Sequence, residues 1–155
     1  MPKLDIVKLN VDAYELEHTF AAFVRAFGLH QNEQTPCGVS VGVSEAHTLT
    51  ELARTGGLTQ SDLVTFLKLE KSTVSRLVQS LEKRAWLKKE PHPTDGRAQL
   101  LTLTSEGSKK AAHIAEARKA KFEALTSVLP EPKREAVLSA LATLTEAIHE
   151  TEKVS

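Results

Sequence analysis

A cluster of short hydroxyl side chains and one arginine within residues 71–79 has the chemistry needed to contact a nucleic acid. Ser72, Thr73 and Ser75 are short enough to let a helix backbone approach a polar surface, and their hydroxyls both donate and accept hydrogen bonds. The Arg76 guanidinium can donate two hydrogen bonds to one guanine, and the backbone amides at a helix N-terminus attract phosphate. We therefore predict that the DNA contacts of this segment come from Lys71, Ser72, Thr73, Ser75, Arg76 and Gln79.

A second group of charged residues brackets a tight turn further along the chain. Lys88 and Lys89 precede the sequence HPTDGR, which contains Asp95 and Arg97. Because Pro, Asp and Gly favour turns, the two flanking arms predict a long, basic β-hairpin. We expect the lysines to contact the sugar-phosphate backbone, and Arg97 to enter a narrow minor groove.

Two helices must position the hydroxyl cluster. Thr59 and Asp62 form an acidic variant of the capping box, which predicts the start of a short helix. A tight connection leads to a second amphipathic helix over residues 71–85, with the hydroxyl cluster on its polar face. The predicted inward-facing residues are Leu63, Phe66 and Leu67 in the first helix and Val74, Leu77, Val78 and Leu81 in the second. This arrangement is typical of a helix-turn-helix, and a basic hairpin directly after it strengthens the prediction.

Residues 58–107, LTQSDLVTFLKLEKSTVSRLVQSLEKRAWLKKEPHPTDGRAQLLTLTSEG, resemble the winged helix-turn-helix regulators of the MarR type. The resemblance implies a mainly α fold with a small β-hairpin wing, and a homodimer that binds a pseudo-palindromic operator in double-stranded DNA, usually as a ligand-responsive repressor. It also implies that Gln60 and Ser61 open the supporting helix and that Asp95 braces Arg97. The chain departs from the pattern at Ala85, where the family usually has glycine, so the exit turn of the recognition helix is expected to differ.

The segments outside this region are predicted to be helical and to mediate dimerisation. One helix covers residues 12–28, a second begins near Ser44 with its hydroxyl as the cap, and two more follow Thr104, separated by Pro130 and Pro132. We expect residues 1–43 to hold the N-terminal dimerisation helix, 44–104 the DNA-binding region and 105–155 the C-terminal dimerisation helices, within one structural domain. The apolar stripes are Phe20, Phe23 and Phe27 in the first helix and Leu141, Leu144 and Ile148 in the last. They would pair between two chains, or alternatively cap one another within a monomer.

The sequence leaves the identity of the effector open between several candidates. A zinc site would use thiolate, imidazole and carboxylate ligands, for which the candidates are Cys37, Glu45, His47, His113 and Glu116. An oxidant sensor would use Cys37, although no adjacent basic residue activates its thiol, and an unreactive cysteine is the plainer alternative. A small organic effector would bind between the dimerising helices and the winged region, with Phe20, Phe23, His47 and Trp86 as the candidate lining.

The charge of the chain is neutral overall but uneven along its length. Its 155 residues contain 20 Lys and Arg and 20 Asp and Glu. Residues 1–53 carry a net −4, whereas residues 68–97 carry a net +4. The single cysteine and the lack of an apolar run long enough to span a membrane predict a cytoplasmic protein.

Two other classes of function, an enzyme and an interaction module, are alternatives for the same sequence. No phosphate-binding loop, HExxH or nucleophile elbow is present, so we expect no enzyme activity. A winged-helix interaction module without DNA binding remains an alternative, although Arg76 and Arg97, whose loss would favour it, are both present.

Overall fold

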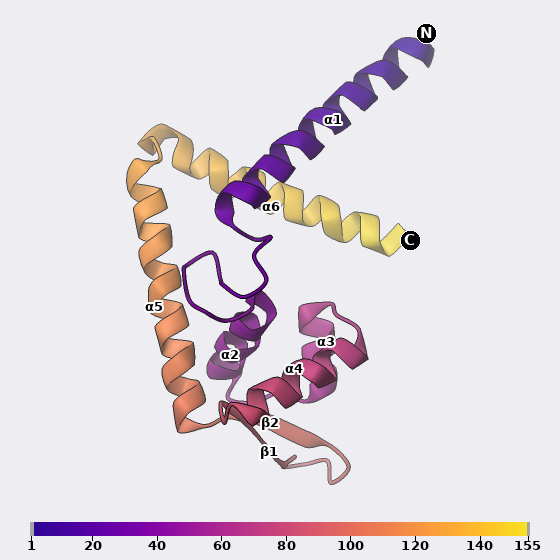
Figure 1. The fold of residues 1–155 in the computed structure, drawn as a ribbon. Helices are drawn as coiled ribbons and strands as arrows, with labels where there is room; N and C mark the ends of the chain where they lie inside the picture. Colours follow the sequence, from indigo (N-terminus) through magenta and orange to yellow (C-terminus); the bar gives the residue numbers. More distant parts are fainter. Residues whose placement is uncertain (1, 155) are drawn as a thin grey trace. The chain divides into compact units, whose positions relative to one another are not determined.

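The computed structural model describes the backbone of residues 2–154 and the side chains of residues 13–154. These residues form the helices α1 (Pro2–Phe27), α2 (Val43–Thr55), α3 (Gln60–Leu67) and α4 (Lys71–Lys83), the strands β1 (Leu87–Pro91) and β2 (Gln99–Leu103), and the helices α5 (Ser105–Val128) and α6 (Glu131–Val154) (Figure 1). The chain divides into two compact units, one up to Ala117 and one from Arg118. None of the described helices is both long and apolar enough to cross a membrane.

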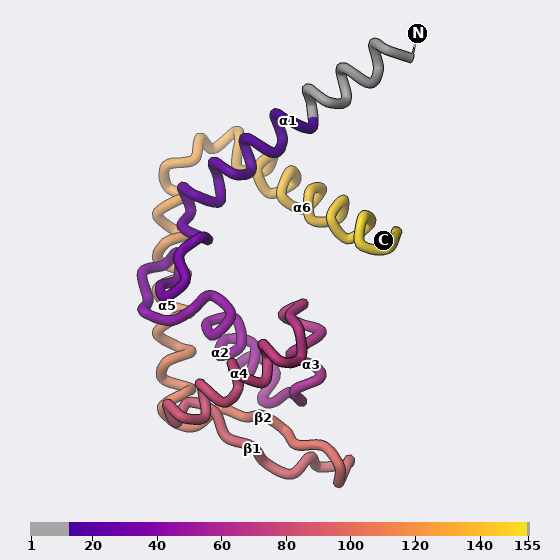
Figure 2. Tube along the Cα trace, turned by 45° about the vertical axis from the view of Figure 1, so that its right-hand side comes forward, coloured from indigo at the N-terminus to yellow at the C-terminus, as the bar shows by residue number. Residues whose placement is uncertain are grey.

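The core of the first unit lies between α2, α3, α4, the hairpin and the beginning of α5. Figures 1 and 2 both show the three short helices gathered at the base of the hairpin, whose tip projects away from them. The fully buried side chains include Leu49, Leu52, Leu63, Val74, Val78, Leu81, Leu101 and Ile114. Because Ala111 and Ile114 of α5 belong to this core, the winged-helix core continues beyond the boundary expected at residue 104.

The hairpin is antiparallel and pairs Leu87 with Leu103 at its base and Pro91 with Gln99 near its tip. Leu58, between α2 and α3, pairs with β2 on the side away from β1. Leu58 donates its amide to the Leu101 carbonyl (3.1 Å) and accepts the Leu101 amide (2.7 Å). Hydrophobic periodicity does not predict this bridge, because a single paired residue has no alternating pattern.

The helix-turn-helix has the predicted helices, but one inward-facing residue was predicted wrongly: Leu63 is buried and Leu67 half-buried, whereas Phe66 is exposed. The Thr59 hydroxyl accepts the Asp62 amide (3.1 Å) and the Asp62 carboxylate accepts the Thr59 amide (2.8 Å), which confirms the capping box. Lys68 ends α3 in the left-handed conformation with φ of 53°. The chain then enters α4, whose buried residues are Val74, Val78 and Leu81.

The exit from α4 is a tight junction between the recognition helix, β1 and α5. Ala85 adopts φ of 57°, the left-handed region that glycine occupies without steric cost. The Thr104 hydroxyl donates to the Ala85 carbonyl (2.6 Å) and accepts the Gly107 amide (3.0 Å). A Cβ at Gly107 would lie 1.8 Å from the Trp86 carbonyl oxygen, so α5 can approach this turn only with glycine there.

The first and last helices carry exposed apolar residues. Helix α1 begins at Pro2, earlier than the predicted residue 12, and exposes Phe20 and Phe23. In the second unit, α6 exposes Leu141 and Ile148 and has no buried residue. Phe27 and Leu144, the other members of the two stripes, are half-buried, so each stripe is partly exposed among the described side chains.

Candidate nucleic-acid interface

Helix α4 has two chemically different faces. Val74 and Val78 are buried beneath it, whereas Ser72, Thr73 and Arg76 are exposed. The remaining predicted contact residues follow the same division: Lys71 and Gln79 are exposed and Ser75 is half-buried. The structure therefore places this predicted set on or at the edge of one accessible helical face, with its N-terminal turn open to solvent.

Two clefts flank the N-terminus of α3 and bring predicted residues from different elements together. One, of about 430 Å³, joins Gln60 and Ser61 to Lys71. The other, of about 700 Å³, joins the same two residues to Lys89 and Arg97 of the hairpin. Gln60 and Ser61 therefore lie between the start of the recognition helix and the wing.

The cap of α3 is already occupied by a charged side chain. Hydrogen bonds from the Thr59 hydroxyl and the Thr59 amide lower the pKa of the Asp62 carboxyl below its ordinary value. Because this carboxylate remains ionised at neutral pH, it complements the positive end of the helix dipole. Phosphate attraction at this site must therefore come from the surrounding side chains rather than from the helix terminus alone.

The two wing lysines form ion pairs within the protein. Lys88 pairs with Glu90 on the same strand, and its ammonium lowers the pKa of the Glu90 carboxyl. The Lys89 Nζ lies 3.0 Å from Glu82 Oε2, which links β1 to the end of α4. Glu82, which no pattern in the sequence singles out, thus joins the wing to the end of α4. Each ammonium is therefore shared with a carboxylate, which reduces the net positive charge that it offers to a phosphate.

Asp95 braces the turn of the wing through the backbone. Its Oδ1 accepts the Arg97 amide (3.0 Å), rather than the Arg97 guanidinium. Among the described side chains, Lys71, Arg76 and Arg97 take part in no hydrogen bond or ion pair and are exposed. These three cations are consequently available to a negatively charged ligand without the loss of an existing interaction.

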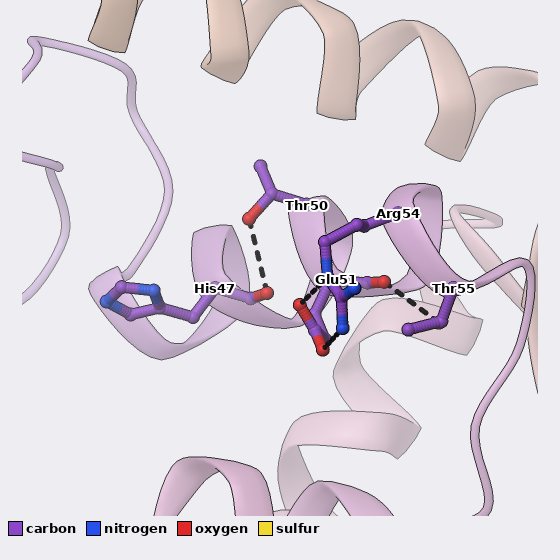
Figure 3. A network of polar contacts seen from close by, with 5 residues as sticks. All are labelled: His47, Thr50, Glu51, Arg54 and Thr55. Carbon is purple, nitrogen blue, oxygen red and sulfur yellow. Dashed lines mark hydrogen bonds and ion pairs between the residues drawn. The ribbon is translucent and has the colours of Figure 1, made fainter.

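The predicted zinc ligands do not form a site within the described chain. No group of three or more His, Cys, Asp or Glu side chains that could hold a metal ion exists among residues 13–154. Cys37 is half-buried, and His113 and Glu116 are exposed on α5. Figure 3 shows the imidazole of His47 on α2 directed away from the Glu51–Arg54 ion pair.

Glu45, also expected as a metal ligand, has a structural role instead. Its carboxylate accepts the Gly42 amide (3.0 Å) and so caps α2, the position that Ser44 was predicted to fill. The same carboxylate pairs with Arg84 at the end of α4, with 2.9 Å between Arg84 Nη2 and Glu45 Oε1. The prediction of a Ser44 cap was wrong, because the N-cap is Gly42, two residues earlier, and Ser44 lies within the helix.

The residues expected to line an organic effector site have separate environments. Phe20 and Phe23 are exposed on α1, and the Phe23 ring stacks on Phe27 with 5.6 Å between centroids. Trp86 is half-buried, with the Arg84 guanidinium 5.0 Å and the Lys110 ammonium 5.3 Å from its ring centroid. Trp86 therefore makes cation–π contacts with two side chains, and these contacts stabilise the turn that follows α4.

A different cleft opens beside the N-terminus of α2. It has a volume of about 650 Å³, and its lining includes Leu29, Glu33, Ser44, Glu45 and Arg84. Its walls are largely polar, and it contains the Glu45–Arg84 pair. None of Phe20, Phe23, His47 and Trp86 lines it.

Comparison with known proteins agrees with this geometry. The family model described as MarR family matches residues 39–98. An uncharacterized HTH-type transcriptional regulator of Mycobacterium leprae is 30% identical over 124 residues, covering 78% of this chain and 82% of the relative. The crystal structure of a probable transcriptional regulator from Pseudomonas aeruginosa superposes with a TM-score of 0.63 and 26% identity, covering 81% of this chain and 92% of the other.

A MarR transcriptional regulator from Methanosarcina mazei has the same fold. Its TM-score is 0.68 at 22% identity, over 88% of this chain and 99% of the other. The matched proteins are regulators of transcription rather than enzymes. With its winged helix-turn-helix, its exposed polar face on α4 and these relatives, the chain belongs to the MarR family of transcriptional regulators.

Proposed function

We propose that this regulator binds a specific double-stranded DNA operator as a homodimer, with α4 in the major groove and the hairpin against the adjacent backbone and minor groove. The observation that carries the proposal is the division of α4, with Val74 and Val78 buried and Ser72, Thr73 and Arg76 exposed. A helix fixed by one face can present the other to base edges without losing its packing. Arg76 is the residue best suited to read a guanine.

The proposal assigns the backbone contacts to side chains around the N-terminus of α3. Gln60 and Ser61 share clefts with Lys71 and Arg97, and both cations lack internal partners among the described residues. Phosphate binding there requires no ion pair to break. Lys88 and Lys89 contribute less, because the charge of each is partly neutralised by a glutamate.

The homodimer is supported by the exposed apolar stripes of α1 and α6. Phe20 and Phe23 are nearly half exposed, at 46% and 47%, as is Ile148 at 45%. Apolar side chains at helical spacing that remain exposed in one chain favour burial against a second copy. A symmetric dimer would place two recognition helices about 34–36 Å apart, as a pseudo-palindromic operator requires.

The response to a ligand is assigned to the cleft beside α2. A small polar molecule bound there would contact Glu45 and Arg84, which join the first turn of α2 to the end of the recognition helix. A ligand that separates this pair changes the support of α4 and so its fit to DNA. The proposal therefore describes a regulator whose DNA binding responds to a ligand, as a ligand-responsive repressor requires.

Selection of bound fragments from random duplex DNA tests the proposal. The expected result is an enriched pseudo-palindromic sequence, protected from cleavage over both half-sites. Repeating the selection with a panel of small polar compounds and with Zn²⁺ identifies the effector by the loss of enrichment. Recovery of unenriched DNA in every condition would reject sequence-specific binding.

A further inference from the structure

His92 lies at the first position after β1 and organises the tip of the wing through its ring. Its Nδ1 accepts the backbone amide of Asp95 (3.1 Å) and that of Thr94 (3.3 Å). A ring nitrogen that accepts two N–H donors must carry its lone pair, so the proton of the neutral imidazole lies on Nε2. The ring therefore replaces a missing main-chain acceptor at this turn.

The hydrogen bonds at the tip form a chain that leads from His92 through Asp95 to Arg97. His92 holds the Asp95 amide, and the Asp95 carboxylate in turn accepts the Arg97 amide (3.0 Å). Two backbone bonds close the same loop, from Ala98 to the Asp95 carbonyl (3.1 Å) and from His92 to the Ala98 carbonyl (3.2 Å). The backbone of Arg97 is thus fixed, while its guanidinium has no partner among the described residues.

We infer that His92 is a positioning residue for the DNA contact of Arg97, an inference that rests on the proposed function. A loop that is ordered before binding loses less conformational entropy when it binds. Without the ring acceptor, the Thr94 and Asp95 amides would turn to water and the tip would sample other conformations. Arg97 would then reach DNA from a less ordered loop, with lower affinity and unchanged chemistry.

Three variants separate this role from general destabilisation. In His92→Ala the acceptor is lost, and we expect operator binding to weaken about three- to tenfold. In His92→Asn the side-chain oxygen can accept an amide two or three residues ahead, as asparagine does in turns and at helix N-caps, and so can replace the ring as the acceptor for Asp95. This variant should bind the operator as the parent does. In an Arg97→Ala background, His92→Ala should have no further effect, because its contribution passes through Arg97.

The experiment measures the dissociation constant of the selected operator for the parent, the three single variants and the double variant, with thermal melting of each as the control for folding. Non-additivity of His92→Ala with Arg97→Ala, and rescue by His92→Asn, support the inference. Unchanged binding by His92→Ala, an equal loss in both backgrounds, or failure of the asparagine rescue would overturn it.

A measurement without DNA keeps the inference distinct from the proposed function. For the neutral form of the His92 ring in the free protein, the ¹⁵N chemical shifts should report an unprotonated Nδ1 and a protonated Nε2. A protonated Nδ1 would refute the wing-tip geometry directly. If the ring has the expected tautomer but the parent shows no operator preference, the proposed function fails while the turn geometry stands.

Discussion

The Glu45 carboxylate lies 2.9 Å from the guanidinium of Arg84, a residue 39 positions away in the sequence, and joins the start of α2 to the end of α4. The same carboxylate caps α2 through the Gly42 amide and accepts the Ser80 hydroxyl at 3.4 Å. The Glu45 side chain is only 13% exposed, whereas that of Arg84 is 41% exposed. One carboxylate therefore supports both a helix terminus and the recognition helix.

Replacing Glu45 should cost more stability than replacing its partner. Glu45→Ala removes the acceptor for the Gly42 amide as well as the ion pair, with an expected loss of about 1–2 kcal/mol. Arg84→Met keeps the alkyl contact of the side chain and removes a partly exposed ion pair together with the cation–π contact to Trp86, for which about 0.5–1 kcal/mol is expected. Urea denaturation of both variants measures the difference. Equal losses would show that the capping bond contributes nothing.

The left-handed conformation of Ala85 predicts a stabilising substitution. Ala85→Gly should raise the free energy of unfolding by about 0.5–1 kcal/mol, because relief of the steric cost at φ of 57° exceeds the entropy that glycine loses on folding. The Thr104 hydroxyl bonds the carbonyl of this residue and is unaffected. As a matched control, Ala115→Gly on the exposed face of α5 should lower stability by about 1 kcal/mol. A loss of stability in Ala85→Gly would contradict the strain assigned to this turn.

The cap of α3 makes stability depend on pH. Because the pKa of Asp62 is lowered in the folded chain, its carboxylate stabilises the fold above the ordinary pKa of aspartate, and this contribution disappears as the pH falls below about 4. Asp62→Asn should therefore be less stable than the parent by about 1 kcal/mol at neutral pH. The difference should shrink as the pH is lowered towards 3. Thermal melting of both proteins across this range checks the direction, and a difference that grows on acidification would be the wrong sign.

The apolar stripe of α6 predicts the assembly state. Ile148→Asp places a charge in the surface that we propose is buried between two copies, so the variant should sediment as a monomer at micromolar concentration. Thr143→Asp adds the same charge to an exposed residue away from the Leu141, Leu144 and Ile148 stripe and should leave the dimer intact. Sedimentation velocity compares the two. A monomeric parent protein would reject the interface itself.

How far the sequence predicts this molecule depends on the separation of the interacting residues. The capping box of Thr59 and Asp62 was predictable because its partners are three residues apart and adopt one known geometry. The buried positions of α4 followed from helical periodicity for the same reason. Local patterns thus determined the helix-turn-helix and the hairpin.

The interactions between distant segments were not predictable in this way. No periodicity links Glu45 to Arg84 or Lys89 to Glu82, because tertiary packing alone brings them together. From the sequence, Glu45 is therefore a candidate metal ligand and the wing lysines are candidate phosphate contacts, with no sign of their internal partners. His92 had a local signal, a polar side chain ahead of Pro93 in a turn, but its ring as an acceptor could be recognised only from the structure.

The most direct test of the central proposal measures how the Arg76 side chain changes the affinity for the operator. Fluorescence anisotropy should measure the affinity of the parent, Arg76→Ala and Lys133→Ala for the selected operator and for a scrambled duplex at the same salt concentration. We expect the parent to prefer the operator by at least about 10³-fold. We also expect Arg76→Ala to lose about 1–3 kcal/mol on the operator and much less on the scrambled duplex. Lys133→Ala, which removes the same charge from α6, should bind as the parent does. Equal affinity of the parent for both duplexes, or an Arg76→Ala variant with the full preference of the parent, would contradict DNA reading by α4.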